Sequence, residues 1–315
     1  MTIPKISILG AGNVGGAAAA AIATRGLGDV YLYDVVPGLA AGKAMDIRHA
    51  LTLFDSDVRV AACASADEVD GSDIVVITAG RPRRAGMKRR DLFRDNLAVV
   101  RGLAEHIARS CPRAQVLVVT NPAEPLVLAL RRRWPALNVA SLGCTLDAVR
   151  FRRFLADAAG EPVSRVDGLV IGSHDDHMVP LAGHAAILGR PVSQVLSPPQ
   201  IADAVSRTRQ AGAAIVAKLK TRGSWYAASH CITAIVKAIV ADTRTVLPLG
   251  VPCTGQYGHR STCLALPCEL GANGIERVLD LALDDDEREA LAVCATEVRR
   301  VADASDGNAP GPPPQ

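Results

Sequence analysis

Short apolar runs that alternate with longer helical patterns dominate the first 145 residues. The longer segments include an alanine-rich stretch that ends near Thr24 and an amphipathic stretch from Asp91 onward, where apolar residues recur at helical spacing. Strands that alternate with helices in this way predict an α/β fold with a doubly wound parallel sheet. The six predicted strands cover residues 6–9, 30–33, 58–60, 74–78, 116–120 and 139–142.

After residue 150 the pattern loosens into helices and shorter strands. A helix with one apolar face is predicted over residues 201–219, and four acidic residues at 284–287 open a last helix, where they complement its dipole. Residues 305–315 are rich in proline and glycine, which predicts a disordered tail. We therefore expect a Rossmann-type domain over residues 1–145, an α+β domain over residues 146–304 and a tail over residues 305–315.

The composition is that of a globular protein, and it gives no indication of a nucleic-acid-binding surface. Of the 315 residues, 49% are hydrophobic, 21% are charged and only 3% are aromatic, so Ala, Val, Leu and Ile must build the core. A net charge of +3 is too small to indicate nucleic-acid binding by itself. No segment approaches the roughly 20 apolar residues that span a bilayer, so we expect no membrane partner.

The N-terminus and the cysteines indicate a cytoplasmic location. An apolar strand pattern begins by Ile6, which leaves no room for a cleaved leader. The eight cysteines are scattered, without a CxxC pair or zinc spacing, so we expect buried reduced thiols and no metal site.

A glycine-rich turn follows the first predicted strand and precedes a helix. It reads GAGNVG over residues 10–15. In a strand–turn–helix context, Gly10 makes the turn, Gly12 lets a pyrophosphate approach and Gly15 lets helix and strand pack closely. Asp34 ends the second strand, 22 residues after Gly12, where a carboxylate binds a ribose diol and favours NAD over NADP. A tight glycine turn alone is the simpler alternative, but strand, helix and acid together favour a dinucleotide site.

A cluster of cations occupies residues 80–96, with six arginines and Lys88. Pro82 and Gly86 prevent a stable helix in its first half, so we predict a mobile loop that enters a helix at Asp91. Guanidinium groups match carboxylates or phosphates bidentately, although a solvated basic surface loop is the alternative. A nucleic-acid role is disfavoured because no aromatic residues interleave with the arginines to stack bases.

Taken in order, the motifs resemble the lactate/malate dehydrogenase family from about Lys5 to Ala304. They are GAGNVG (10–15), ITAGRPRRAGM (77–87), VVTNP (118–122), LDAVRFR (146–152), GSHDDHMVP (172–180) and GQYG (255–258). The resemblance implies an NAD-dependent homodimer or homotetramer of the tricarboxylic acid cycle. The NAD-binding residues that it implies are Gly10, Gly12, Asn13, Val14, Gly15, Asp34, Thr78, Ala79, Gly80, Asn96 and Asn121.

The resemblance also assigns catalytic and substrate-binding roles. His174 resembles the catalytic acid/base, with Asp147 as its carboxylate partner. Arg150 resembles the residue that binds the C1 carboxylate, and Arg89 the one that polarises the reacting carbonyl. Two further substrate-binding residues are Asn121 and Arg83, the second standing where malate enzymes carry arginine and lactate enzymes a neutral glutamine.

The chemistry explains these residue types. Oxidation of a 2-hydroxy acid needs a base that titrates near neutrality, which histidine provides, and a bidentate partner for the first carboxylate. The second carboxylate of a dicarboxylic substrate needs one more cation, which Arg83 supplies. With lactate or pyruvate bound, Arg83 would instead lie unpaired above the substrate's methyl group, and burying that bare charge would cost free energy. We therefore expect interconversion of malate and oxaloacetate. The alternatives are a lactate or other 2-hydroxy-acid dehydrogenase, or a catalytically silent dinucleotide-binding homologue.

The sequence departs from the family pattern at three places. Asp175 follows His174 where the family usually has glycine, and we expect its side chain to face away from the imidazole. Ala85 stands where the family often has proline, which predicts a more flexible loop. The segment over residues 223–230 differs in length from the family's substrate-side helix, so the role of Ser224 stays open.

Overall fold

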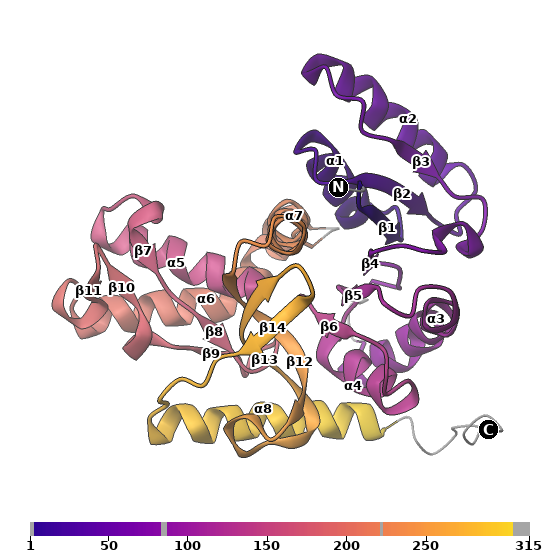
Figure 1. The fold of residues 1–315 in the computed structure, drawn as a ribbon. Helices are drawn as coiled ribbons and strands as arrows, with labels where there is room; N and C mark the ends of the chain where they lie inside the picture. Colours follow the sequence, from indigo (N-terminus) through magenta and orange to yellow (C-terminus); the bar gives the residue numbers. More distant parts are fainter. Residues whose placement is uncertain (1–2, 83–86, 221–222, 305–315) are drawn as a thin grey trace.

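A nine-stranded sheet forms the centre of the molecule (Figure 1). The computed structural model describes residues 3–82, 87–220 and 223–304, so the predicted tail lies outside the described residues. The sheet order is β14-β13-β12-β6-β5-β4-β1-β2-β3. Its parallel strands are β1 (Lys5–Leu9), β2 (Asp29–Tyr33), β3 (Val60–Ala62), β4 (Ile74–Ile77), β5 (Gln115–Val118) and β6 (Val139–Ser141).

These six strands confirm the predicted doubly wound parallel sheet, with one strand displaced. We expected residues 58–60, but β3 starts at Val60 and pairs with β2 as far as Ala62. The strand extends through Ala61 and Ala62, whose small side chains contribute little to an apolar pattern. The register with β2 therefore decides where β3 lies.

Eight α-helices are present in the described part of the chain. They are α1 (Asn13–Thr24), α2 (Leu39–Leu51), α3 (Arg89–Ser110), α4 (Ala123–Arg133), α5 (Thr145–Ala159), α6 (Pro198–Leu219), α7 (Tyr226–Val240) and α8 (Asp285–Asp303). The acidic run lies at the start of the last helix, as predicted, and Asp284 caps α8 by accepting a hydrogen bond from the backbone N–H of Glu287. The short 3₁₀ helices are η1 (Thr52–Phe54), η2 (Ala66–Val69), η3 (Val163–Arg165), η4 (Ala182–His184), η5 (Val192–Gln194) and η6 (Gln256–Gly258).

The start of α3 differs from the prediction. The helix begins at Arg89 rather than at Asp91, with Lys88 in an extended conformation before it. Arg89 and Arg90 are therefore helical and do not belong to the preceding loop. Residues 83–86 lie outside the described residues, so the predicted mobility of the loop stays a prediction.

The sheet continues beyond the six predicted strands. Antiparallel strands β12 (Thr245–Thr254), β13 (Arg260–Gly271) and β14 (Gly274–Val278) extend it past β6, where Gly250 pairs with Ser141. A Cβ at position 250 would collide with the Ser141 hydroxyl, so glycine permits this close approach. The C-terminal part thus shares one sheet with the N-terminal part (Figure 1).

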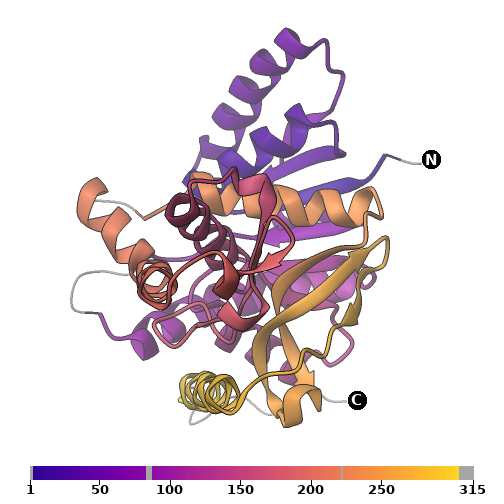
Figure 2. The same ribbon diagram turned by 90° about the vertical axis from the view of Figure 1, so that its left-hand side faces the viewer.

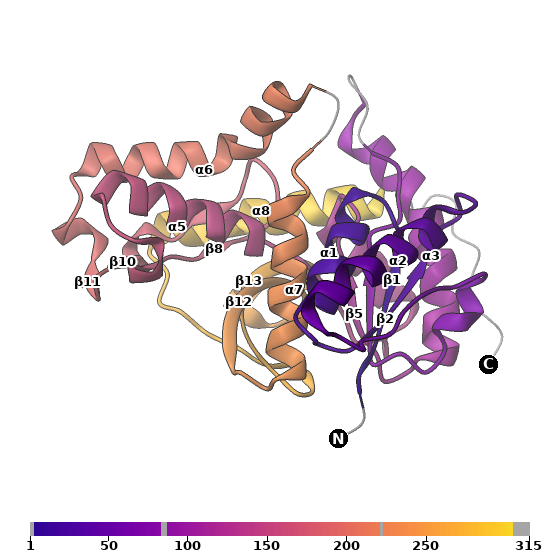
Figure 3. The same ribbon diagram turned by 90° about the horizontal axis from the view of Figure 1, so that it is seen from above.

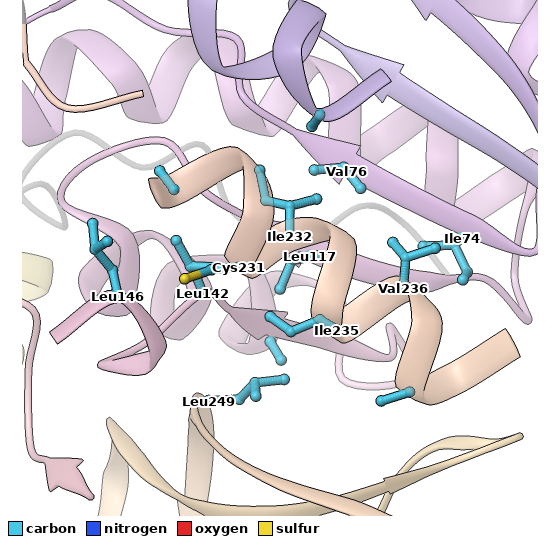
Figure 4. Close-up of a cluster of buried hydrophobic side chains, with 14 of the residues drawn as sticks. Ile74, Val76, Leu117, Leu142, Leu146, Cys231, Ile232, Ile235, Val236 and Leu249 are labelled. Atoms are coloured by element: carbon cyan, nitrogen blue, oxygen red, sulfur yellow. The ribbon is translucent and has the colours of Figure 1, made fainter. Parts of the chain in front are cut away.

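Alternate residues of the central strands face two separate apolar layers. On β4, Ile74 and Val76 join the layer under α1 and α7, whereas Val75 and Ile77 join the layer under α3 and α4. Figure 4 shows Ile232, Ile235 and Val236 of α7 packed close to β4 and β5; these residues form one buried cluster with Ile74 and Val76. Both faces are covered, so the side chains of β4 are apolar on both faces of the sheet.

The C-terminal part adds a smaller core of its own. Helices α5 and α6 pack together beside short strands, which are β7 (Val166–Asp167), β8 (Val170–Ile171), β9 (Val179–Pro180), β10 (Ala186–Ile187) and β11 (Arg190–Pro191). Helix α7 contacts α1 on one side and α5 on the other (Figure 3). Helix α8 packs against β13 and α4, at the base of the molecule in Figure 2.

Buried reduced cysteines are confirmed, because all eight thiols are buried and free. None of the described helices is both long and apolar enough to cross a membrane. Within residues 3–82, 87–220 and 223–304, no group of three or more His, Cys, Asp or Glu side chains is arranged to hold a metal ion.

Candidate active site

The glycine turn between β1 and α1 has the shape that a dinucleotide requires. A Cβ on Gly15 would collide with the carbonyl oxygen of Gly10 and lie 2.7 Å from the Thr78 hydroxyl oxygen. A Cβ on Gly12 would meet nothing within 4 Å, so the surface in front of the N-terminus of α1 is open. A helix N-terminus beside such an open surface suits an anion, because its backbone N–H groups carry partial positive charge. Asn13 and Val14 form the first turn of the helix.

Asp34 lies directly beyond β2 and close to this turn. Its Oδ2 accepts a hydrogen bond from the backbone N–H of Ala11 at 2.6 Å, and its Oδ1 accepts one from Val36 at 2.9 Å. These two bonds fix the carboxylate beside the glycine turn. Each oxygen has further lone pairs, so it also suits a ribose diol.

The segment after β4 lies beside the same turn. The Thr78 hydroxyl donates to the carbonyl oxygen of Gly10 at 2.7 Å, and Thr120 donates to the carbonyl oxygen of Ala79 at 2.7 Å. A Cβ on Gly80 would collide with Thr120, so the strand-end loops are closely packed. The predicted NAD-binding residues are thus brought together at the carboxyl ends of β1, β2, β4 and β5.

Asn96 of α3 joins two of these loops. Its Oδ1 accepts from the backbone N–H of Arg81 at 2.7 Å, and its Nδ2 donates to the carbonyl oxygen of Asn121 at 2.7 Å. The side chain is buried and already satisfied by backbone groups. In this structure Asn96 therefore orders the loops around Asn121, which is itself exposed beyond β5.

Asp147 and His174 form a buried pair although 27 residues separate them. The Nδ1 of His174 is 2.6 Å from Asp147 Oδ2, and the side chains are 26% and 0% exposed. Asp147 lies on the first turn of α5, and His174 follows β8 in the turn that leads to β9. The contact holds Nδ1 protonated and leaves Nε2 as the nitrogen for proton transfer.

The surroundings of His174 favour its protonated form. The negative charge of Asp147 raises the pKa of His174 above its ordinary value, and the hydrogen bond that His174 donates to Asp147 acts in the same direction. Burial of the ring and the charge of Arg150 oppose this rise, but the net pKa shift is upward. The imidazole therefore keeps its proton to a higher pH than a free histidine does, which suits a group that gives and takes a proton.

Arg150 completes the buried group from the same helix as Asp147. Its Nη1 donates to Asp147 Oδ1 at 3.1 Å, and its side chain is only 11% exposed. Its Nε is buried, and no described residue accepts a hydrogen bond from it. A buried guanidinium nitrogen without an acceptor is costly in a protein interior. The planar guanidinium beside the Asp147–His174 pair suits a carboxylate ligand.

Arg89 and Asp175 form an ion pair that we did not foresee. Arg89 Nη1 lies 2.5 Å from Asp175 Oδ2, and Nη2 donates to the carbonyl oxygen of His174 at 3.2 Å. Asp175 does not bond to the imidazole ring, as we expected. It does not face solvent either, because Arg89 and the backbone N–H of His177 hold its carboxylate in place.

Glu124 is a site residue that the sequence reasoning missed. Its buried carboxylate accepts from the Ser141 hydroxyl at 3.0 Å and from the backbone N–H of His174 at 3.4 Å. Burial raises the pKa of Glu124 above its ordinary value. Glu124 is the single charged residue between Pro122 and Leu130, and this isolation within an apolar stretch was the available signal.

Three other residues from the sequence analysis are not placed in a contact. Arg83 and Ala85 lie outside the described residues, so their roles stay predictions. Ser224 is described as partly exposed just before α7.

A nucleotide-binding sheet that ends beside a carboxylate–imidazole pair and a buried guanidinium defines a dehydrogenase that acts on anionic hydroxy acids. The lactate/malate dehydrogenase NAD binding domain matches residues 4–135, and the lactate/malate dehydrogenase alpha/beta C-terminal domain matches residues 144–305. The chain belongs to the lactate/malate dehydrogenase family. It is an NAD-dependent oxidoreductase, which confirms the expected family, fold and cofactor.

Individual relatives agree with this assignment. The malate dehydrogenase of Desulforudis audaxviator is 40% identical over 299 residues, which cover 94% of this chain and 97% of that protein. Among solved structures, Cryptosporidium parvum malate dehydrogenase is 32% identical with a TM-score of 0.93, covering 98% of this chain and 100% of that chain. The lactate dehydrogenase of the same organism, solved with lactic acid and NAD, is 31% identical with an equal TM-score and equal coverage. The fold alone therefore does not separate the two activities.

Proposed function

We propose that the protein is a malate dehydrogenase, which transfers a hydride reversibly between (S)-malate and NAD to give oxaloacetate and NADH. The observation that carries the proposal is the buried Arg150 guanidinium, whose Nε lacks an acceptor beside the Asp147–His174 pair. A substrate carboxylate on Arg150 would supply that acceptor and bring the substrate to the imidazole.

In the direction of malate oxidation, His174 accepts the proton of the C2 hydroxyl on its Nε2. Asp147 holds the opposite nitrogen and stabilises the imidazolium that forms. Arg150 binds the C1 carboxylate, and Asn121 hydrogen-bonds the substrate beyond β5. Bound NAD supplies the two-electron acceptor for the C2 hydride.

The residues around the glycine turn fit this cofactor. The open face of Gly12 and the N-terminus of α1 suit a pyrophosphate, and Asp34 suits a ribose diol. Thr78, Ala79 and Gly80 would line the cofactor beyond β4, with Asn13, Val14, Asn96 and Asn121 completing the binding site.

Two arguments favour malate over lactate. Several curated relatives that share 36–40% identity with the chain carry the name malate dehydrogenase. In addition, Arg83 supplies the extra cation that a second carboxylate needs. Arg89 has a separate role, because it would stabilise the charge that develops on the carbonyl oxygen. A lactate dehydrogenase is the competing function, because solved enzymes of that name share the fold.

The deciding experiment compares NADH consumption with oxaloacetate and with pyruvate. We expect oxaloacetate to be the better substrate, and faster reduction of pyruvate would overturn the proposal. Arg83→Gln should raise the KM for oxaloacetate about 10- to 100-fold because a charge-assisted hydrogen bond is lost. Arg84→Gln is the matched control, since it removes the same charge from the neighbouring position and should leave the KM nearly unchanged.

Further proposals concern the setting of this reaction. The domain limits at residues 145 and 304 and the cytoplasmic location follow from the sequence pattern. The place in the tricarboxylic acid cycle and the homodimer or homotetramer follow from the resemblance to the family. The proposal includes neither a nucleic-acid nor a membrane partner. Light scattering after size-exclusion chromatography would test the oligomer, and a monomer would contradict it.

A further inference from the structure

We propose that Asp175 is a positioning residue that holds Arg89 away from the reacting carbonyl until substrate displaces it. This inference rests on the proposed function, because it concerns the arginine assigned to the carbonyl oxygen. The ion pair between Arg89 Nη1 and Asp175 Oδ2 is 2.5 Å long, and 86 residues separate the two partners. This ion pair exists only because the residue directly after His174 is Asp175, which carries a carboxylate.

The carboxylate of Asp175 is well ordered for this role. Its side chain is 8% exposed, and its Oδ1 accepts a hydrogen bond from the backbone N–H of His177 at 2.8 Å. Its own backbone N–H donates to the carbonyl oxygen of Ser173 at 2.7 Å. Asp175 is thus fixed to the turn between β8 and β9, and the guanidinium is the partner that moves.

The guanidinium of Arg89 is directed towards a cleft beside α4 and α8. Described residues that line this cleft with Arg89 and Asp175 include Glu124 and, from α8, Glu297, Val298 and Val301. Neither Arg150 nor Asn121 is among the described residues of its lining. In this arrangement Arg89 therefore lines a cleft whose described lining lacks the residues proposed to bind the substrate carboxylate.

A substrate must compete with this arrangement for Arg89. The Arg89 side chain is 37% exposed, so water weakens the ion pair and displacement is feasible. Displacement also leaves the Asp175 carboxylate with one strong partner fewer, which costs free energy on binding. Asp175 therefore weakens substrate affinity through its ion pair with Arg89.

The test measures KM and kcat for oxaloacetate in Asp175→Asn, which keeps the side-chain size and the acceptor for His177. We expect KM to fall about three- to tenfold while kcat stays within about twofold. An unchanged KM, or a kcat that falls tenfold, would overturn the inference, because Asp175 would then be neutral or would orient Arg89 productively. Asp175→Ala also removes the ion pair with Arg89, so it should reproduce the fall in KM.

Two comparisons make the result specific. Glu297→Gln removes a carboxylate from the same cleft, but Glu297 pairs with Arg300, so KM should not change. In an Arg89→Gln background, Asp175→Asn should no longer lower KM, because the interaction has already been removed. A fall in KM in either variant would indicate a general charge effect and contradict the role of Asp175.

A second readout is independent of turnover. A double-mutant cycle of Arg89→Gln and Asp175→Asn, followed by urea unfolding of the ligand-free protein, should show a coupling between the two positions. Additive effects would overturn the inference. If the parent fails to reduce oxaloacetate but the coupling is present, the proposed function fails while the ion pair stands.

Discussion

The two sides of the candidate site differ in how firmly the structure holds their residues in place. On one side, Asp147, Arg150 and His174 form a buried group in which each residue fixes the next. On the other side, Arg89 at the start of α3 is partly exposed and pairs with Asp175 outside that group. The first side already has the geometry that the proposed proton transfer and carboxylate binding need, whereas the second would have to rearrange to take its proposed part.

The difference has a physical origin in the positions of the residues. Asp147 and Arg150 lie one turn apart on α5, whose apolar residues join the small C-terminal core, so the helix holds both in register. Arg89 is the first residue of its helix, where the chain has fewer packing constraints. Burial therefore fixes the side that contains Asp147 and Arg150, whereas the side that contains Arg89 is completed only when a ligand binds.

The largest expected effect comes from breaking the preorganised side. Asp147→Asn should lower kcat about 10³- to 10⁴-fold, because the amide does not hold His174 in the correct tautomer or stabilise its cation. Steady-state rates with oxaloacetate and NADH measure the loss. A decrease of less than about tenfold would show that the pair is not central to proton transfer.

A smaller effect is expected at Arg150. Arg150→Lys keeps the charge but loses the planar fork, so kcat/KM should fall about 10- to 100-fold. Arg152→Lys is the matched control from the same helix, because among the described residues the Arg152 side chain donates to the backbone carbonyls of Val163 and Val166. Equal losses in the two variants would contradict a specific role for Arg150.

The smallest effect concerns pH. Asp147 raises the pKa of His174, so oxaloacetate reduction should persist above pH 6.5 and decline only as pH rises through the raised value. Malate oxidation should increase across the same interval. The pair's contribution to folding should be complete below the unfolded pKa of about 6.5 and disappear as pH rises through the folded pKa.

Profiles of kcat/KM in both directions, with urea midpoints over the same range, measure this behaviour. A transition at or below pH 6.5 would contradict the structure. Removal of the Asp147 charge should move the transition to lower pH, because that charge is the largest cause of the shift.

The sequence by itself determined the features that depend on local pattern. The alternation of strands with helices predicted the parallel sheet, and GAGNVG with Asp34 predicted the nucleotide turn, because their geometry arises within a few residues. Family-like motifs identified His174, Asp147 and Arg150. The structure then placed these three residues in contact.

Only the tertiary structure decided the features that depend on distant partners. Ser141 and Gly250 join two parts of the chain into one sheet, and Arg89 pairs with Asp175 across 86 residues. Glu124 becomes a buried acid only because β6 and the His174 turn pack around it. Such contacts depend on which surfaces meet after folding. The local pattern of apolar and polar residues does not specify which surfaces those are.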